Sequence, residues 1–262
     1  MIAVDGPAAR QYGRLAAPRV LTELTTESVL CLPIGSHEQH GPHLPLNTDT
    51  VIAERFTGLL AQRYGEQHDL WALPAIPYGL SLEHTWSPGT VSLRITSFMS
   101  LLNAVVTEHL QATPARRLLI INGHGGNRGI LEPALYELQR THAVSVCVIH
   151  PASLSTVQVG GATVPEIHAG IRETAMMLEL APEDVHLNSL PTDFTANGAE
   201  AKRLVLDRGT TWPWTSGDTT IATCGVIGGD PRRATADTGR AILDSALDAA
   251  GHVLTHLTNH SP

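Results

Sequence analysis

Short apolar runs alternate along the chain with longer segments in which apolar residues recur at helical spacing. Four continuous apolar runs have the length of a β-strand: 28–34, 70–76, 117–121 and 143–149. Such runs are typical of strands in a parallel sheet that is covered on both faces. The periodic segments predict helices over 50–64, 96–111, 129–142, 174–180 and 234–258. Repeated strand–helix units predict an α/β fold with a mostly parallel sheet, in one domain over residues 1–262.

The pattern also predicts some local details. Asp49 or Thr48 is expected at the N-cap of the helix over 50–64, where a side-chain oxygen accepts a backbone N–H, and Gly65 is expected to end it. Residues 186–230 have no clear period and are expected to be irregular. Three tryptophans outside the predicted helices and strands are interpreted as packing residues: Trp86, Trp212 and Trp214.

Composition narrows the class of protein. Hydrophobic residues make up 42% of the 262 and charged residues 16%, which favours a folded protein with a substantial core. The net charge of −8 and the absence of a Lys/Arg cluster exclude nucleic acid as an expected partner. No apolar stretch approaches the ~20 residues that cross a bilayer. The three cysteines are widely spaced and are expected to be buried free thiols: Cys31, Cys147 and Cys224. The sequence also has no signal-peptide pattern. Together these features predict a cytoplasmic protein.

Polar clusters follow the predicted strands, where sites form in open α/β sheets. The first, residues 35–49, contains Glu38 and His40, whose side chains point the same way in an extended segment, and ends in Asp49. The second is Asn122-Gly-His-Gly-Gly-Asn127, where glycines leave His124 free to approach an ion. Carboxylate and imidazole together are typical ligands of Zn²⁺ and similar divalent ions.

A third cluster, from His168 to Glu173, crosses the start of a predicted helix and joins the same site only if the turn is irregular. Together the loops hold enough ligands for two ions that share a bridging carboxylate. Such a pair polarises a carbonyl and lowers the pKa of a bound water toward ~7. A nearby Glu or His then carries the proton to the leaving nitrogen. The chain has no G-x-S-x-G or H-E-x-x-H motif, and no phosphate-binding glycine motif.

These motifs resemble the creatininase (creatinine amidohydrolase) family. The resemblance rests on residues 35–46, Thr48-Asp49, Asn122–Asn127, His168-Ala-Gly with Glu173-Thr174, and residues 225–235. It implies a three-layer α/β/α fold, a homohexamer, and a dinuclear site that hydrolyses an amide C–N bond of a small molecule or short peptide. Zn²⁺ is the expected ion, and Mn²⁺ or Fe²⁺ also fits. The mycofactocin-peptidase-like branch is suggested by Glu83-His84 before Pro88-Gly-Thr90.

The resemblance also implies roles for residues. Glu38 and His40 bind different ions, and Asp49 bridges the two ions. His124 completes the ligands of the first ion. Creatininase has a Glu where this chain has Gly126, so Glu173 is expected as the last ligand, with His168 as a proton shuttle or substrate contact. Candidate substrate-binding residues are Glu83, His84 and Asn127. The loop over 151–165 lacks the tryptophans that enclose creatinine in that enzyme, so creatinine is not the expected substrate.

Two alternatives remain open at this stage. The first is a mononuclear formamide hydrolase (a deformylase), which the missing Glu at position 126 suggests. The second is a catalytically silent family member that serves as a metal-stabilised assembly subunit.

Overall fold

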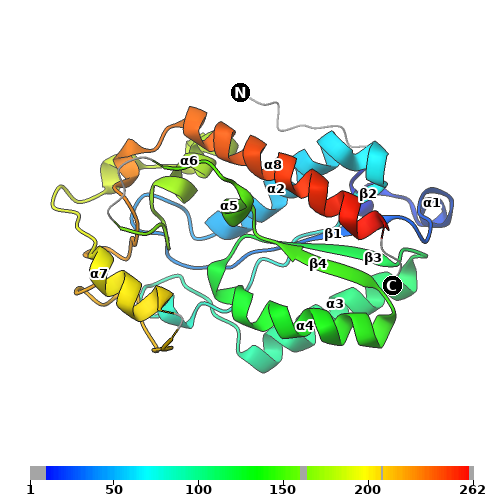
Figure 1. The fold of residues 1–262 in the computed structure, drawn as a ribbon, viewed down its shortest axis with the longest axis horizontal. Coiled ribbons are helices and arrows are strands. Elements are labelled where there is room, and N and C mark those ends of the chain that lie inside the picture. The colour runs from blue at the N-terminus through cyan, green and yellow to red at the C-terminus, as the bar shows by residue number, and fades with distance from the viewer. Residues whose placement is uncertain (1–9, 160–163, 208, 260–262) are drawn as a thin grey trace.

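The protein is built around a parallel β-sheet, seen edge-on in Figure 1. The computed structural model describes residues 10–159, 164–207 and 209–259. The sheet has the strand order β2-β1-β3-β4. Its strands are β1 (Val29–Ile34), β2 (Leu70–Ala72), β3 (Arg117–Asn122) and β4 (Ser145–Ile149). Every residue of β1 and β3 is buried, as the continuous apolar runs predict.

Helices cover both faces of the sheet (Figure 1). One face packs against three helices: α2 (Thr48–His68), α6 (Ile171–Leu180) and α8 (Ala236–Asn259). The other packs against α3 (Ile95–Ala112) and α4 (Arg128–His142). Successive residues alternate between the two cores because side chains of a strand point to opposite faces: Cys31 lies in the first core and Leu30 in the second. The predicted three-layer α/β/α fold is confirmed, and its being a single domain stays a prediction.

The strand order creates a crevice at one end of the sheet. From β1 the chain passes through α2 to β2 on one side, then through α3 to β3 on the other side of β1. The order therefore reverses between β1 and β3, and open α/β sheets bind ligands at that point. The last residues of the two strands, Ile34 and Asn122, are paired in register. Two of the polar clusters thus begin side by side.

The boundaries of α2 and β2 differ from the prediction. Asn47 occupies the N-cap position of α2, so Asp49 lies inside the first turn rather than at the cap. Gly65 does not end the helix, which continues to His68 and stops where Asp69 adopts a left-handed φ of 48°. β2 ends early, at Ala72, because the pairing with β1 becomes irregular beyond it: the N–H of Leu73 donates to the Cys31 carbonyl, and the next N–H to donate to β1 is that of Ile76, to Pro33.

Residues 186–230 are mostly irregular, and the longest helical segment in them begins with α7 (Gly198–Ala201). Asn197 accepts hydrogen bonds from the N–H groups of Ala199 and Glu200 and so caps α7, which continues as a π-helical turn over Lys202–Leu206. The remaining short helices are α1 (Ala17–Glu23) and α5 (Pro151–Leu154), with 3₁₀ turns over Tyr12–Arg14, Leu82–His84, Gly125–Asn127, Pro182–Asp184, Leu187–Ser189 and Pro231–Arg233. The loop predicted over 151–165 is wrong at its start, where Pro at the first helical position begins α5, and its residues 160–163 lie outside the described residues.

The interpretation of the tryptophans as packing residues is wrong for two of them. Trp86 and Trp212 are 49% and 50% exposed. The indole N–H of Trp86 donates to the hydroxyl of Ser216, so a polar contact fixes this ring while one side faces solvent. Trp214 is half-buried and lies edge-on to His84.

The cysteines are free, as predicted. Cys31 is buried, and burial raises the pKa of its thiol, whereas Cys147 and Cys224 are half-buried. Within the described ranges, no helix combines the length and the apolar character that crossing a membrane requires.

Candidate metal centre

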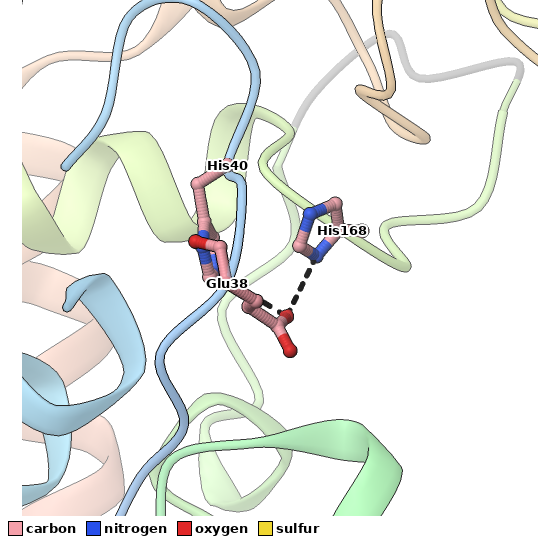
Figure 2. Close-up of side chains that lie close together, drawn as sticks. All are labelled: Glu38, His40 and His168. Atoms are coloured by element: carbon pink, nitrogen blue, oxygen red, sulfur yellow. Dashed lines mark hydrogen bonds and ion pairs between the residues drawn. The ribbon is translucent and has the colours of Figure 1, made fainter. Parts of the chain in front are cut away.

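All five predicted ligands meet beyond the ends of β1 and β3. Glu38 and His40 come from the loop after β1, Asp49 from the first turn of α2, His124 from the loop after β3, and Glu173 from the first turn of α6. His168 lies beside them (Figure 2). All are buried except Glu173, whose side chain is 19% exposed. The irregular turn that the third cluster requires is present: Ala169 has a φ of 55°, and its N–H donates to Glu173 Oε2 over 2.6 Å.

The side chains form three overlapping groups, each with ligand atoms within 4.8 Å of one another. The groups are Glu38–Asp49–His124, His40–Asp49–Glu173 and Glu38–His40–His168. Asp49 belongs to the first two and faces them with different oxygens. Its Oδ2 lies 3.0 Å from His124 Nδ1, and its Oδ1 lies 3.1 Å from His40 Nε2. Asp49 is thus the carboxylate that these two groups share.

Hydrogen bonds orient the three histidine rings. In each ring, the nitrogen away from the cluster lies within hydrogen-bond distance of a backbone carbonyl oxygen: His40 of Glu38 (3.1 Å), His124 of Leu80 (2.7 Å) and His168 of Gln39 (2.7 Å). A carbonyl only accepts, so that nitrogen carries a proton. In the neutral ring the other nitrogen then presents its lone pair to the carboxylates. This is the outer hydrogen bond that metal-binding histidines characteristically make.

Several carboxylate oxygens at the centre make no hydrogen bond within the described structure. Among the described residues, both oxygens of Glu38 and Oδ2 of Asp49 are buried without a hydrogen bond. Burial alone would raise the pKa of Asp49, but the charges of His40 and His124 hold it below its usual range. Burial likewise opposes a charge on His40, yet Asp49 and Glu38 raise its pKa to about 9. The cluster therefore requires positive charge, and a divalent cation fits these donors.

His84 faces the same cluster with a proton rather than a lone pair. Ser216 Oγ accepts hydrogen bonds from Trp86 and Gln39, so its own hydroxyl donates to His84 Nδ1 over 2.7 Å. His84 Nε2 then carries the hydrogen and lies 3.4 Å from Glu38 Oε1. Burial lowers the pKa of His84 to about 4, which keeps the ring neutral. This contact orients Glu38, and the substrate contact predicted for His84 stays untested.

Gln39 and Ser216 are site residues that the sequence reasoning missed. Both are buried: Ser216 contacts His84, the backbone carbonyl of Gln39 accepts from His168, and the two imidazole rings stack with centroids 4.0 Å apart. Gln39 lies within the first polar cluster and was visible there between two predicted ligands. Ser216 comes from an irregular segment more than a hundred residues later, and no local pattern marks it.

Asn127 joins loops of the site. It is fully buried, its Nδ2 donates to the carbonyl of Gly35 and to Asn122 Oδ1, and its Oδ1 accepts the N–H of Leu80. Both of its N–H donors and one lone pair of its carbonyl oxygen are directed at the protein. These bonds support a positioning role for Asn127, and the substrate contact predicted from sequence stays untested.

Glu83 lies opposite Gly126. A Cβ at Gly126 would meet Glu83 Oε1 at 2.8 Å, His124 Nε2 at 2.4 Å and the Leu80 carbonyl oxygen at 2.3 Å. The space that a side chain at position 126 would need is therefore filled, partly by the carboxylate of Glu83. Burial raises the pKa of Glu83, and its side chain is 18% exposed.

Gly126→Ala is expected to lower the metal content and the activity by roughly tenfold or more. The new methyl group displaces the His124 ring from Leu80, and losing such an orienting hydrogen bond costs ~10–100-fold in metal affinity or activity. Gly125→Ala is the matched control, because a Cβ there meets no atom within 4 Å. Metal content by elemental analysis checks both variants. Equal metal content in the two would contradict the role given to the His124–Leu80 bond.

A cavity of about 310 Å³ opens beside the cluster. His124, His168 and Glu173 form part of its wall, so it reaches the candidate ligands directly. Its volume is at the lower end of the ~300–1,000 Å³ of small-molecule sites. The site can therefore bring a small ligand against the buried carboxylates and histidines.

Comparisons with known proteins show which family and fold this chain is similar to. The family model described as "Creatininase: Creatinine amidohydrolase" matches residues 14–254. The mycofactocin precursor peptide peptidase of Mycobacterium tuberculosis H37Rv is 35% identical over 237 residues, covering 86% of this chain and 83% of that protein. A crystal structure of a putative creatinine amidohydrolase from Bacteroides fragilis matches with a TM-score of 0.75 at 21% identity, covering 96% of this chain and 97% of that one. Two solved creatininases, a manganese form and a zinc–zinc form of a variant, each match with a TM-score of 0.70 at 22% identity, covering 94% of this chain and 97% of theirs.

Proposed function

The chain belongs to the creatininase family of metal-dependent amide hydrolases, and we propose that it cleaves a C–N amide bond of a short peptide or small molecule at a dinuclear metal site. One observation carries the proposal. Buried carboxylate oxygens of Glu38 and Asp49 without hydrogen bonds in the described structure face histidine nitrogens whose rings are fixed by carbonyl oxygens.

The ligand groups suggest how two ions would be held. Glu38, Asp49 and His124 would hold one ion, and His40, Asp49 and Glu173 the other. Zn²⁺ is the expected ion, because mixed carboxylate and imidazole ligands suit it, and Mn²⁺ or Fe²⁺ fits the same set. When bound, such ions act as Lewis acids toward the amide carbonyl and make water a nucleophile at neutral pH.

We assign the proton transfer to His168. Its Nε2 is held by the carbonyl of Gln39, so its Nδ1 is free to accept a proton from the attacking water. Burial, and the positive charge of His40, keep the pKa of His168 well below its usual range. The ring therefore does not retain the proton and passes it to the leaving nitrogen. Gln39 acts as a positioning residue in this step.

Peptides are the favoured substrates. The curated relative reported above acts on a precursor peptide. Creatinine is not expected, because the loop over 151–165 lacks tryptophan. Glu83 lies at the edge of the cluster and is proposed to contact the substrate.

Removal and return of metal tests the proposal. Chelator-treated protein is expected to lose hydrolysis of a panel of short peptides and N-acyl amino acids, and Zn²⁺ or Mn²⁺ is expected to restore it. Amine release is the measurement, with creatinine as the control substrate. Hydrolysis that persists after the metal is removed, or that is confined to creatinine, would contradict the proposal.

The hexamer, the cytoplasmic location, and the absence of nucleic-acid or membrane partners stay predictions.

A further inference from the structure

The cavity beside the candidate ligands has a second wall that the proposed chemistry does not use. Besides His124 and Glu173, the lining includes Arg128, the first residue of α4, and His150, which follows β4. Both side chains offer hydrogen-bond donors to the cavity.

The guanidinium of Arg128 has no partner in the part of the chain that the structure describes. No hydrogen bond or ion pair involves it, and Glu132, one turn later on α4, is the acidic group whose charge acts on it. The other arginine of the cavity, Arg172, is engaged: it donates to the carbonyl oxygens of Ala152 and Val157 over 3.3 and 2.6 Å. Arg128 is therefore the arginine of this wall that is available to a ligand.

His150 presents an N–H to the same space. Asn122 Oδ1 accepts from Asn127 Nδ2 over 3.1 Å, so Asn122 Nδ2 is the donor that contacts His150 Nδ1 at 3.0 Å. The hydrogen of His150 consequently lies on Nε2. Burial, and then the charge of Arg128, lower the pKa of His150 to about 4, so the ring is a neutral donor.

The charge of this part of the cavity lining is complementary to that of a ligand with a single negative charge. Glu166 also lines the cavity, but its two oxygens accept the N–H groups of Arg172 and Gly229 over 2.9 and 2.7 Å. One unpaired guanidinium and one neutral N–H balance a single negative charge. The guanidinium fork binds a carboxylate through two parallel hydrogen bonds, whereas a dianionic phosphate would face the repulsion of Glu166 and Glu173.

We propose that Arg128 and His150 bind a carboxylate of the substrate, so that the amides this protein hydrolyses carry a carboxylate close to the scissile bond. This inference rests on the proposed amide hydrolysis. The carboxylate can be the α-carboxylate of a peptide or an acidic side chain, which the experiment distinguishes.

Binding to the metal-loaded protein tests the inference without relying on turnover. Two probe pairs differ only in the carboxylate: N-acetylglycylglycine against its C-terminal amide, and N-acetylaspartic acid α-amide against N-acetylasparagine α-amide. We expect the acid of at least one pair to bind about tenfold more tightly than its neutral partner, as measured by calorimetry. Arg128→Gln is expected to reduce that ratio to about one, and His150→Ala by a smaller factor of about threefold.

Arg140→Gln, an exposed change of equal charge on the same helix, is the matched control and should keep the preference. The pair that responds to Arg128→Gln identifies the source of the carboxylate. A preference that persists in Arg128→Gln at equal metal content would overturn the inference, because the carboxylate would then bind elsewhere, for example on the metal. Lost preference without hydrolysis of any amide would instead refute the proposed function and leave the anion site standing.

Discussion

Asp49→Ala is expected to remove both metal ions and to abolish amide hydrolysis, with a loss well above 100-fold. Asp49 is shared by two ligand groups and faces His40 and His124 with different oxygens. No other described carboxylate contacts both of those histidines at comparable distances. Losing an orienting partner of a ligand already costs ~10–100-fold, so losing a shared ligand costs more.

Glu54→Ala is the matched control for this change. Glu54 is an exposed carboxylate on the same helix, one turn and a half beyond Asp49, and it belongs to no ligand group. Elemental analysis and amine release are measured on both variants, and circular dichroism confirms that each is folded. A folded Asp49→Ala protein that still holds two ions per chain would rule out the bridging role.

Glu173→Gln is expected to lower the metal content from two ions per chain to about one, with a large loss of activity. Glu173 belongs only to the group that contains His40, so the group with His124 stays complete. Glutamine keeps an oxygen that can accept the Ala169 N–H, which preserves the turn at positive φ. The change therefore removes the charge of the ligand while it leaves the local backbone supported.

The exposed Glu183→Gln serves as the control for a lost carboxylate and should keep both ions. Two ions in the Glu173→Gln protein would place this residue outside the metal ligands. The metal ligand that creatininase has at the position of Gly126 would then be missing here, with no other residue in its place. One ion in both the native and the variant protein would instead favour the mononuclear formamide hydrolase.

The sequence predicts the site residues correctly where the order and direction of the strands alone bring their side chains together. β1 and β3 are continuous apolar runs, and the residues that follow parallel strands meet at one edge of the sheet. That logic brings Glu38, His40 and His124 together without knowledge of the fold's details.

Other parts of the site depend on tertiary contacts that no local pattern records. The alignment of Ser216 with His84 depends on the packing of an irregular segment against the 3₁₀ turn over Leu82–His84. The polar contact of Trp86 follows from that same packing, which is why this ring was wrongly interpreted as a packing residue. The position of Glu173 beside the other ligands depends on the left-handed backbone of Ala169. Alanine rarely adopts this conformation, so the sequence does not predict it.

The most direct test of a dinuclear centre is elemental analysis of the native protein, purified under anaerobic conditions and without added metal, with ions counted per chain. The account predicts about two divalent ions per chain, both released by a strong chelator. A protein that is active as an amide hydrolase with one ion per chain, or with none, would contradict it.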